Sequence, residues 1–263
     1  MSNSDRSQSD GQGARDYADV VNRTQVASLR VVAATLPEGD HSTFGIVKAV
    51  STGLGTDMLN EVYIFEEPTQ PSAVEAVEWM TDRGVPYSVV VGRSVLNEAE
   101  PILNDLGFTQ VGSEPGMVLD PLGDIPANES LADIGEAITV NEIEDAADVF
   151  SSVFGVSPAV STRFFRSPGA IDGIDSRILL AEVNGEPAGC GICITYDDIV
   201  GVYGIGVREA FRRRGIGEAL TWETIRVGRD HGGRIAMLLT TEMGYPLYTQ
   251  MGFETVVHHH EFV

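Results

Sequence analysis

The chain has 263 residues, 43% of them hydrophobic and 7% aromatic, which is enough for one large domain or two small ones and excludes a wholly disordered protein. Its 39 acidic and 17 basic residues give a net charge of −22, which disfavours binding to nucleic acid or to an anionic membrane. No apolar stretch approaches the roughly 18 residues of a membrane helix. Only two cysteines are present, so we expect a cytoplasmic protein without a disulfide scaffold.

The excess of acidic residues is spread along the whole chain. Residues 1–130 carry 20 acids and 7 bases, and residues 131–263 carry 19 acids and 10 bases. Lys48 is the only lysine. An acidic binding site would gather its charge in one region. The even distribution is instead typical of a surface adapted to the high salt of halophilic cells, with ordinary solubility as the alternative.

Hydrophobic periodicity predicts alternating helices and strands in the first half of the chain. Residues 1–16 are polar and are expected to form a disordered tail. The first helix is indicated by Val20, Val21, Leu29 and Val32, which recur at helical spacing. The expected helices are 17–37, 73–83 and 98–106, and the expected strands are 43–50, 60–65, 87–91 and a strand after Phe108.

A segment rich in proline, glycine and acidic residues, 121–134, is predicted to be a linker between domains at 17–120 and 135–263. In the second domain, Asn184-Gly185 predicts a hairpin turn between two strands. The expected helices there are 142–154, one that runs from a glycine-rich turn to about residue 229, and 245–250. The expected strands are 177–183, 187–194, 199–207, 235–240 and 254–262.

The two halves also resemble each other. The segment from Pro101 to Phe108 and the segment from Pro246 to Phe253 both consist of a short helix, a glycine and a phenylalanine before a strand. A structural duplication explains this similarity. The alternative is that both segments use a common helix ending, in which glycine is followed by an apolar anchor.

The segment Arg212-Arg-Arg-Gly-Ile-Gly217 follows a predicted strand and opens a helix. With Arg208 it forms a cluster of positive charge in an acidic chain. The first amides of a helix lack internal partners, the helix dipole adds positive potential, and glycine lets a ligand approach the backbone closely. The segment therefore predicts a phosphate-binding loop, with a basic surface patch as the alternative. It lacks the Gly-Lys-Ser/Thr of a P-loop and the three glycines of a dinucleotide fingerprint.

The pattern Val207-x4-Arg212-x-x-Gly215-x-Gly217, followed by Leu247-Tyr248-x3-Gly252-Phe253, resembles the acetyl-CoA motif of the GNAT (GCN5-related) N-acetyltransferases. The resemblance covers about residues 135–263. It implies an α/β fold with a mixed, mostly antiparallel sheet flanked by helices. It also implies direct transfer of an acetyl group from acetyl-CoA to a primary amine in a ternary complex, without a metal ion.

The resemblance also assigns residue roles. It implies that the cofactor contacts the backbone of the strand ending at Val207, then the loop, and a polar residue before Tyr248. The implied cofactor-binding residues are Ile205, Val207, Arg212, Arg213, Arg214, Gly215, Ile216, Gly217 and Thr241. Thr241 departs from the family, in which many members carry asparagine at this position.

Tyr248 matches the family's usual general acid, which protonates the departing thiolate, and Tyr245 is a weaker candidate. The general base is open between Glu242, which follows a strand end, and Tyr203, which lies on the strand leading to Val207. Asp197 and Asp198 fall in a predicted hairpin turn and are expected to be solvated.

The first half lacks the counterparts of the phosphate loop and of Tyr248. At the position of the loop it has Glu66-Glu-Pro-Thr-Gln-Pro71, in which prolines remove amide donors and glutamates repel phosphate. Leu103 stands where the second half has Tyr248. We therefore expect a tandem GNAT protein with a degenerate N-terminal half, which completes the acceptor pocket, packs against the active half or pairs subunits in a homodimer.

Two other motifs are interpreted structurally. Cys190 and Cys193 have the spacing of a redox or zinc motif, but they lie in a predicted strand, where residues three apart point to opposite faces. His258-His259-His260 also lies in a strand, so no metal site is expected there. A non-catalytic acyl-CoA-binding or protein-interaction module remains the alternative to an acetyltransferase, and the acceptor, small molecule or peptide, is not specified by the sequence.

Overall fold

A computed structural model of the chain describes residues 15–167, 169–171 and 173–263. The predicted disordered tail, residues 1–16, lies outside the described residues except for its last two. Asp16 caps the first helix by accepting hydrogen bonds from the amides of Ala18 and Asp19. None of the helices in the described part of the chain is both long and apolar enough to cross a membrane.

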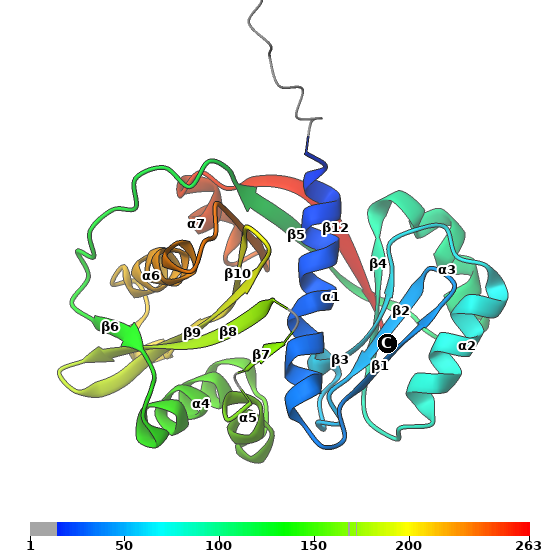
Figure 1. Cartoon of the computed structure of the whole chain (residues 1–263), viewed down its shortest axis with the longest axis horizontal. Coiled ribbons are helices and arrows are strands. Elements are labelled where there is room, and N and C mark those ends of the chain that lie inside the picture. The colour runs from blue at the N-terminus through cyan, green and yellow to red at the C-terminus, as the bar shows by residue number, and fades with distance from the viewer. Residues whose placement is uncertain (1–14, 168, 172) are drawn as a thin grey trace, which may run out of the picture.

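Helices lie on both faces of one long, twisted sheet (Figure 1). The α-helices are α1 Tyr17–Thr35, α2 Gln70–Thr81, α3 Leu96–Asp105, α4 Val140–Phe154, α5 Pro158–Phe165, α6 Ile216–Asp230 and α7 Tyr245–Gln250. The strands are β1 Asp40–Phe44, β2 Val47–Ser51, β3 Asn60–Ile64, β4 Ser88–Gly92, β5 Gln110–Leu119, β6 Asp133–Glu136, β7 Ala170–Ile171, β8 Ile174–Val183, β9 Glu186–Tyr196, β10 Ile199–Val207, β11 Ile235–Leu239 and β12 Glu254–Phe262. Short 3-10 turns occupy Asp57–Leu59, Arg93–Val95 and Glu209–Phe211.

Most of the predicted elements are present, but one prediction was wrong. The single strand expected at 43–50 is a hairpin, in which β1 and β2 are joined by a turn at Gly45 with φ of +62°. Only Gly45 and Ile46 separate the two strands, and this turn lacks the Asn-Gly or Asp-Gly pair that most clearly marks a two-residue hairpin, so the sequence did not reveal it. Sequence reasoning also missed β6, α5 and the two-residue strand β7.

The sheet contains the same arrangement of strands twice, once starting from each of its two ends. The order is β1-β2-β3-β4-β12-β5-β11-β10-β9-β8-β6. Each unit has three antiparallel strands, a crossover helix and a parallel fourth strand, and β6 adds a further antiparallel strand at the edge of the second unit. The parallel pairs are β3 with β4 and β10 with β11. The two units are related by a local two-fold axis between β5 and β12, and the last strand of each lies beside the fourth strand of the other.

The axis passes through one pair of residues. Glu114 of β5 is directly opposite His259 of β12. The sequence separation of these two residues equals that of Phe108 and Phe253, which end the two equivalent helices. Glu114 and His259 are therefore equivalent positions of the two units that face each other at their junction.

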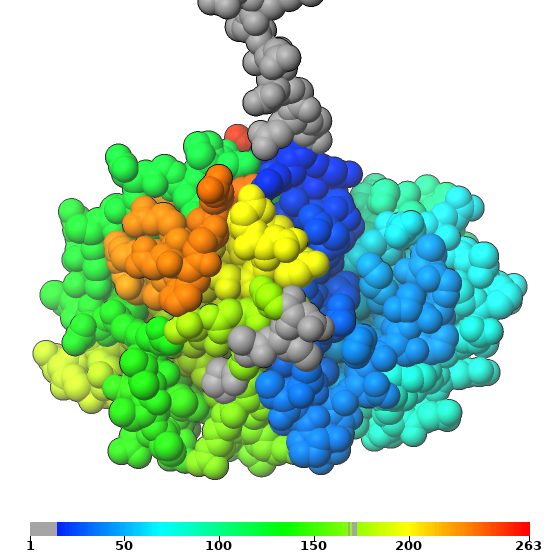
Figure 2. Space-filling model, in the orientation of Figure 1, coloured from blue at the N-terminus to red at the C-terminus, as the bar shows by residue number. Residues whose placement is uncertain are grey.

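Helix α1 covers this junction. Figure 1 shows it crossing the middle of the molecule, and Figure 2 shows it exposed between the two halves. It contacts strands of both units, including β2, β5, β10 and β12. Val20 and Val21 pack on the apolar residues of β11, and His259 lies beneath α1, where its Nε2 is 2.7 Å from the Asn22 side-chain oxygen. The helix thus binds both units on one face.

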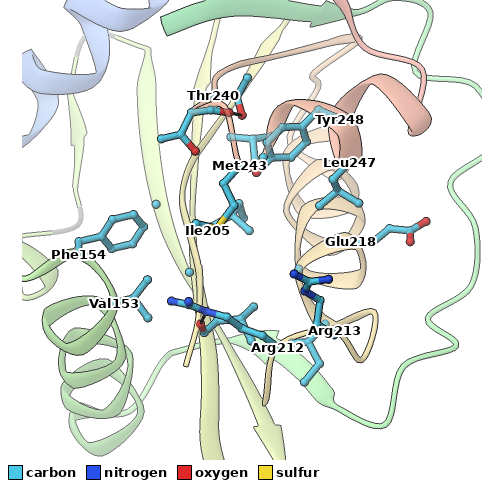
Figure 3. A pocket seen from close by; sticks show the side chains of 18 of the residues that line it. Val153, Phe154, Ile205, Arg212, Arg213, Glu218, Thr240, Met243, Leu247 and Tyr248 are labelled. Atoms are coloured by element: carbon cyan, nitrogen blue, oxygen red, sulfur yellow. Dashed lines mark hydrogen bonds between the residues drawn. The ribbon is translucent and has the colours of Figure 1, made fainter. Parts of the chain in front are cut away.

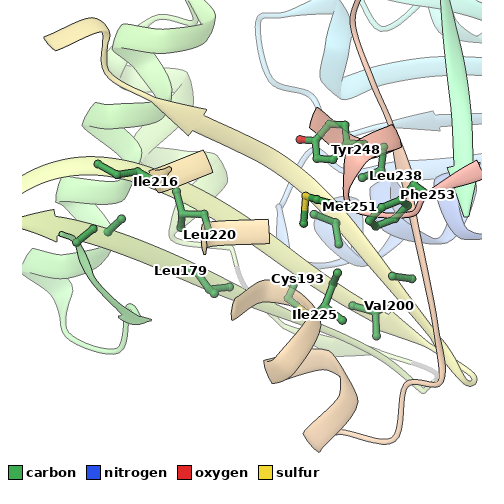
Figure 4. Close-up of a cluster of buried hydrophobic side chains, with 14 of the residues drawn as sticks. Leu179, Cys193, Val200, Ile216, Leu220, Ile225, Leu238, Tyr248, Met251 and Phe253 are labelled. Carbon is green, nitrogen blue, oxygen red and sulfur yellow. The ribbon is translucent and has the colours of Figure 1, made fainter. Parts of the chain in front are cut away.

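The second unit has its own core between the sheet and helices α6 and α7 (Figure 4). Leu179, Leu220 and Ile225 are fully buried in it. Cys193 belongs to this cluster, whereas Cys190 belongs to the cluster beneath α4 on the opposite face of the sheet. Both cysteines are free and buried, which confirms that they are packing residues.

A first test concerns the exchanged strands. The fragment 135–263 lacks β5, the strand that pairs with both β11 and β12. Expressed alone, we expect it to be unfolded or to associate through its open strand edges, as measured by circular dichroism and gel filtration. Co-expression with residues 1–134 should restore a one-to-one complex. A folded, monomeric fragment would show that the second unit does not need β5 of the first half.

A second test concerns Glu61 of β3, a partly buried residue close to Glu114 and Glu261. Burial, with repulsion from those two carboxylates, raises its pKa from 4.5 to about 8. Between pH 4.5 and about 8, Glu61 is therefore neutral in the folded protein but ionised in the unfolded chain. Its contribution to the free energy of unfolding is complete below pH 4.5 and is lost as the pH rises to about 8.

Glutamine does not titrate and keeps the shape of the neutral carboxyl. Glu61→Gln should therefore raise the thermal midpoint at pH 8 by about 5 °C, and the gain should shrink toward pH 4.5. Glu66→Gln, at an exposed neighbouring position, is the matched control. An equal gain at both pH values would show that Glu61 is not protonated in the folded protein.

Candidate active site

The adjacent strands β10 and β11 separate along their length. They are paired only from Ile199 with Ile235 to Gly201 with Met237, although β10 continues to Val207. A bulge in β10, between Tyr203 and Gly206, accompanies the separation, and Gly204 adopts φ of +57° there. A Cβ atom at Gly204 would meet Ile192 and Phe150 at about 3.2–3.3 Å, so this backbone conformation requires glycine. The separation leaves an opening in the middle of the sheet.

The loop after β10 carries amide groups without partners. Arg213 and Gly215 have φ of +62° and +75°, and Gly215 caps α6 without any side-chain hydrogen bond. Within the described residues, the backbone N–H groups of 213–218 make no hydrogen bond. Successive free amides at a helix start bind anions, and the positive end of the helix dipole adds to this.

A cavity of about 660 Å³ joins the separated strands to this loop (Figure 3). Arg212 and Arg213 lie at one end of it, and Thr240 and Tyr248 lie at the other. The middle is apolar and is lined by Val153, Phe154, Ile205 and Leu247. The cavity therefore suits an elongated molecule with an anionic end and an apolar body.

Tyr248 occupies the end of the cavity remote from the arginines. It lies in α7, is 9% exposed, and packs edge-to-face on Phe253 with ring centroids 5.9 Å apart. Burial raises the pKa of Tyr248, although a hydrogen bond with Thr221 opposes the shift. The phenol is therefore protonated at neutral pH and can donate a proton. A Cβ atom at Gly244 would approach the Tyr248 ring to 3.0 Å, so glycine there makes room for the ring.

Glu114 lines the same cavity, and sequence reasoning missed it. It comes from β5, in the first half of the chain, and the neighbouring Pro115 carbonyl accepts a hydrogen bond from the Thr240 amide at 3.2 Å. Burial and repulsion from Glu261 raise the pKa of Glu114. No motif marks this residue, because only the exchange of strands brings it to the second half. The available signal was a single acid within a strand.

The structure brings together most of the residues expected to bind a cofactor. The cavity lining includes Ile205, Val207, Arg212, Arg213, Gly215, Ile216, Gly217 and Thr241. The Arg212 side chain also donates from Nε to the Val207 carbonyl at 2.9 Å, which ties the loop to the strand end.

Three expected site residues lie elsewhere. Arg214 turns away, donating to the Ala210 carbonyl and packing over the Phe211 ring. Glu242 is exposed and does not line the cavity, and the hydroxyl of Tyr203 is beneath α1, 3.5 Å from the Met237 sulfur. Tyr203 points to the opposite side of the sheet because residue 203 precedes the bulge that reorients Ile205.

The first half does not form an equivalent opening. β3 and β4 are paired at four successive positions, from Glu61 with Ser88 to Ile64 with Val91. Helix α2 begins with a capping box in which Thr69 and Ser72 bond to each other's backbone amides, so these donors are already used. Leu103, the counterpart of Tyr248, is fully buried. The sheet and the cap thus close the site that is open in the second half.

The sequence of residues 148–253 matches the model of the acetyltransferase (GNAT) family. No curated protein matches the chain. Among solved structures, the chain is similar to a GCN5-related N-acetyltransferase from Kribbella flavida, with 14% identity, a TM-score of 0.69, and coverage of 92% of this chain and 95% of that one. It is similar to another from Sphaerobacter thermophilus, with 19% identity, a TM-score of 0.60, and coverage of 82% and 75%.

A tandem GNAT protein from the clavulanic acid biosynthesis pathway is also similar, with 14% identity, a TM-score of 0.57, and coverage of 94% and 96% of the two chains. At these identities the likeness concerns the fold. The predicted fold class, a mixed and mostly antiparallel sheet flanked by helices in two related halves, is confirmed.

Proposed function

We propose that the second half of the chain, in which residues 148–253 match the model of the GNAT acetyltransferase family, transfers an acetyl group from acetyl-CoA to a primary amine. The observation that carries the proposal is the set of unbonded amides at 213–218 beside the gap between β10 and β11. A pyrophosphate fits the amides of the loop, and an extended pantetheine arm fits the gap as an added strand.

Acetyl-CoA supplies the thioester, whose carbonyl carbon the acceptor nitrogen attacks while the carbon–sulfur bond breaks. Tyr248, protonated and buried at the far end of the cavity, is suited to give its proton to the departing thiolate. Glu114 is suited to receive the proton that the amine loses, because its raised pKa lies closer to neutrality than that of an ordinary carboxyl. The first half would thus contribute a base to a site in the second half.

Titration calorimetry with acetyl-CoA, in low salt and in multimolar KCl, tests the cofactor site. Acetyl transfer is tested by measuring release of the CoA thiol with a panel of amines. The panel includes polyamines, aminoglycosides and peptide amino groups. Binding without release for any amine would favour the alternative of an acyl-CoA-binding module. Absence of binding in either salt would reject the proposal.

Gly217→Ala separates cofactor binding from folding. A Cβ atom at 217 would meet Val207 and Leu247 only at 3.8 and 3.9 Å, and alanine is favoured over glycine within helices by about 1 kcal/mol. We expect an unchanged or higher thermal midpoint with about tenfold weaker acetyl-CoA binding, because the added methyl group keeps the pyrophosphate from the amides. Unchanged affinity would mean that the ligand does not approach the start of α6.

Tyr248→Phe and Glu114→Gln test the two proton transfers. Each should lower turnover about 100-fold with little change in acetyl-CoA affinity, measured by steady-state CoA release and by calorimetry. In Glu114→Gln the loss should be greatest at neutral pH and smaller at alkaline pH, where the free amine is abundant. Glu186→Gln, in the exposed β8–β9 turn, is the matched control. If Glu242→Gln lost turnover and Glu114→Gln kept it, Glu242 and not Glu114 would be the general base.

A further inference from the structure

A second cavity, of about 440 Å³, lies where the two halves meet on the α1 side of the sheet. One wall is α1, a second is the β1–β2 hairpin, and the third is formed by Ile174 and Tyr196 at the paired ends of β8 and β9. Its volume falls within the range of small-molecule sites. It is separate from the candidate active site, with which it shares no lining residue.

Basic side chains are concentrated in this second cavity. Arg23 and Arg30 of α1 are two helical turns apart and therefore lie on one face, with Val26 and Ala27 between them. Lys48, the only lysine of the chain, lines the opposite wall. Across the hairpin Lys48 pairs with Thr43, and His41, another lining residue, pairs with Val50, so these side chains share the face toward α1.

Two of the basic groups of the second cavity, Arg30 and Lys48, have no acidic partner among the described residues. None of the residues lining this cavity is acidic, in a chain of net charge −22. Arg23 is paired with Asp19 at 2.7 Å and Asp197 at 3.7 Å. Neither Arg30 nor Lys48 forms an ion pair with any described residue, and the buried Nε of Arg30 finds no hydrogen-bond acceptor among them.

Such an arrangement is unfavourable without a ligand. Two partly buried cations repel each other across the cavity, and a buried donor without an acceptor loses the hydrogen bond it would make to water. An oxyanion would remove both penalties, because it accepts charge-assisted hydrogen bonds from guanidinium and ammonium groups together. The hydroxyls of Ser42 and Thr43, which also line the cavity, are further donors.

We propose that this second cavity, between α1 and the β1–β2 hairpin, binds a small oxyanion carrying at least two negative charges, as a phosphate ester or a polycarboxylate does. Lys48 and Arg30 hold the anion, and Ile174 and Tyr196 contact the apolar part of the same molecule. Because these walls belong to both halves, the ligand also stabilises their junction by mass action. This site goes beyond the proposed acetyl transfer and does not depend on it.

Calorimetric titration of the full chain with pyrophosphate and with citrate, at matched ionic strength in chloride, tests the site. Phosphate esters are favoured if only pyrophosphate binds, and polycarboxylates if only citrate binds. Lys48→Gln and Arg30→Gln should each weaken binding about tenfold, as expected for the loss of one charge-assisted contact. Without ligand, each should also raise the thermal midpoint, because repulsion between the two cations is relieved.

Two arginine variants are the controls. Arg166→Gln removes the same charge from the surface, where Arg166 pairs with Glu144, and should leave binding unchanged. Arg213→Gln alters the loop of the candidate active site and should leave anion binding in the second cavity unchanged. A loss of pyrophosphate binding in this variant would show that pyrophosphate binds at that loop instead. Equal binding in the wild type, Lys48→Gln and Arg30→Gln, or no binding of either anion, would overturn the proposal.

Discussion

The antiparallel pairing of β5 with β12 is the interaction on which the rest of the molecule depends. Each strand ends one unit and pairs with the fourth strand of the other, β5 with β11 and β12 with β4. Backbone hydrogen bonds therefore run without interruption from one unit to the next, and neither unit has a complete sheet by itself. Separation of the halves would expose two strand edges and the apolar underside of α1.

The two units have kept one topology and differ in a few local interactions. In the second, Gly215 caps α6 without a side-chain hydrogen bond, and β10 pairs with β11 at only three positions, so backbone groups remain without partners among the described residues. In the first, a capping box at Thr69 and continuous pairing of β3 with β4 use the corresponding groups within the protein. The open second unit and the closed first unit thus differ in where their backbone hydrogen bonds go.

Because β5 pairs with strands of the second unit, the first unit also contributes a residue to the candidate site. Glu114 reaches the cavity because β5 lies beside β11, and burial, with repulsion from Glu261 of β12, raises its pKa. Burial also raises the pKa of Glu61 of β3, so we expect carboxyls buried at the junction to lower the stability of the fold as the pH rises toward 8.

The sequence alone determined the local features of this protein: most helices and strands from their periodicity, the repeat from Phe108 and Phe253, and the loop rich in arginine and glycine from Arg212 to Gly217. These depend on residues close together in the chain. The hairpin at 43–50 was missed because its turn is only two residues long and lacks an Asn-Gly or Asp-Gly pair. Only the tertiary structure decided that β5 and β12 exchange, that Glu114 rather than Glu242 lines the cavity, and that Lys48 faces Arg30. Each of these depends on pairing between segments far apart in the chain, for which the amino-acid pattern of a single strand specifies a face but not a partner.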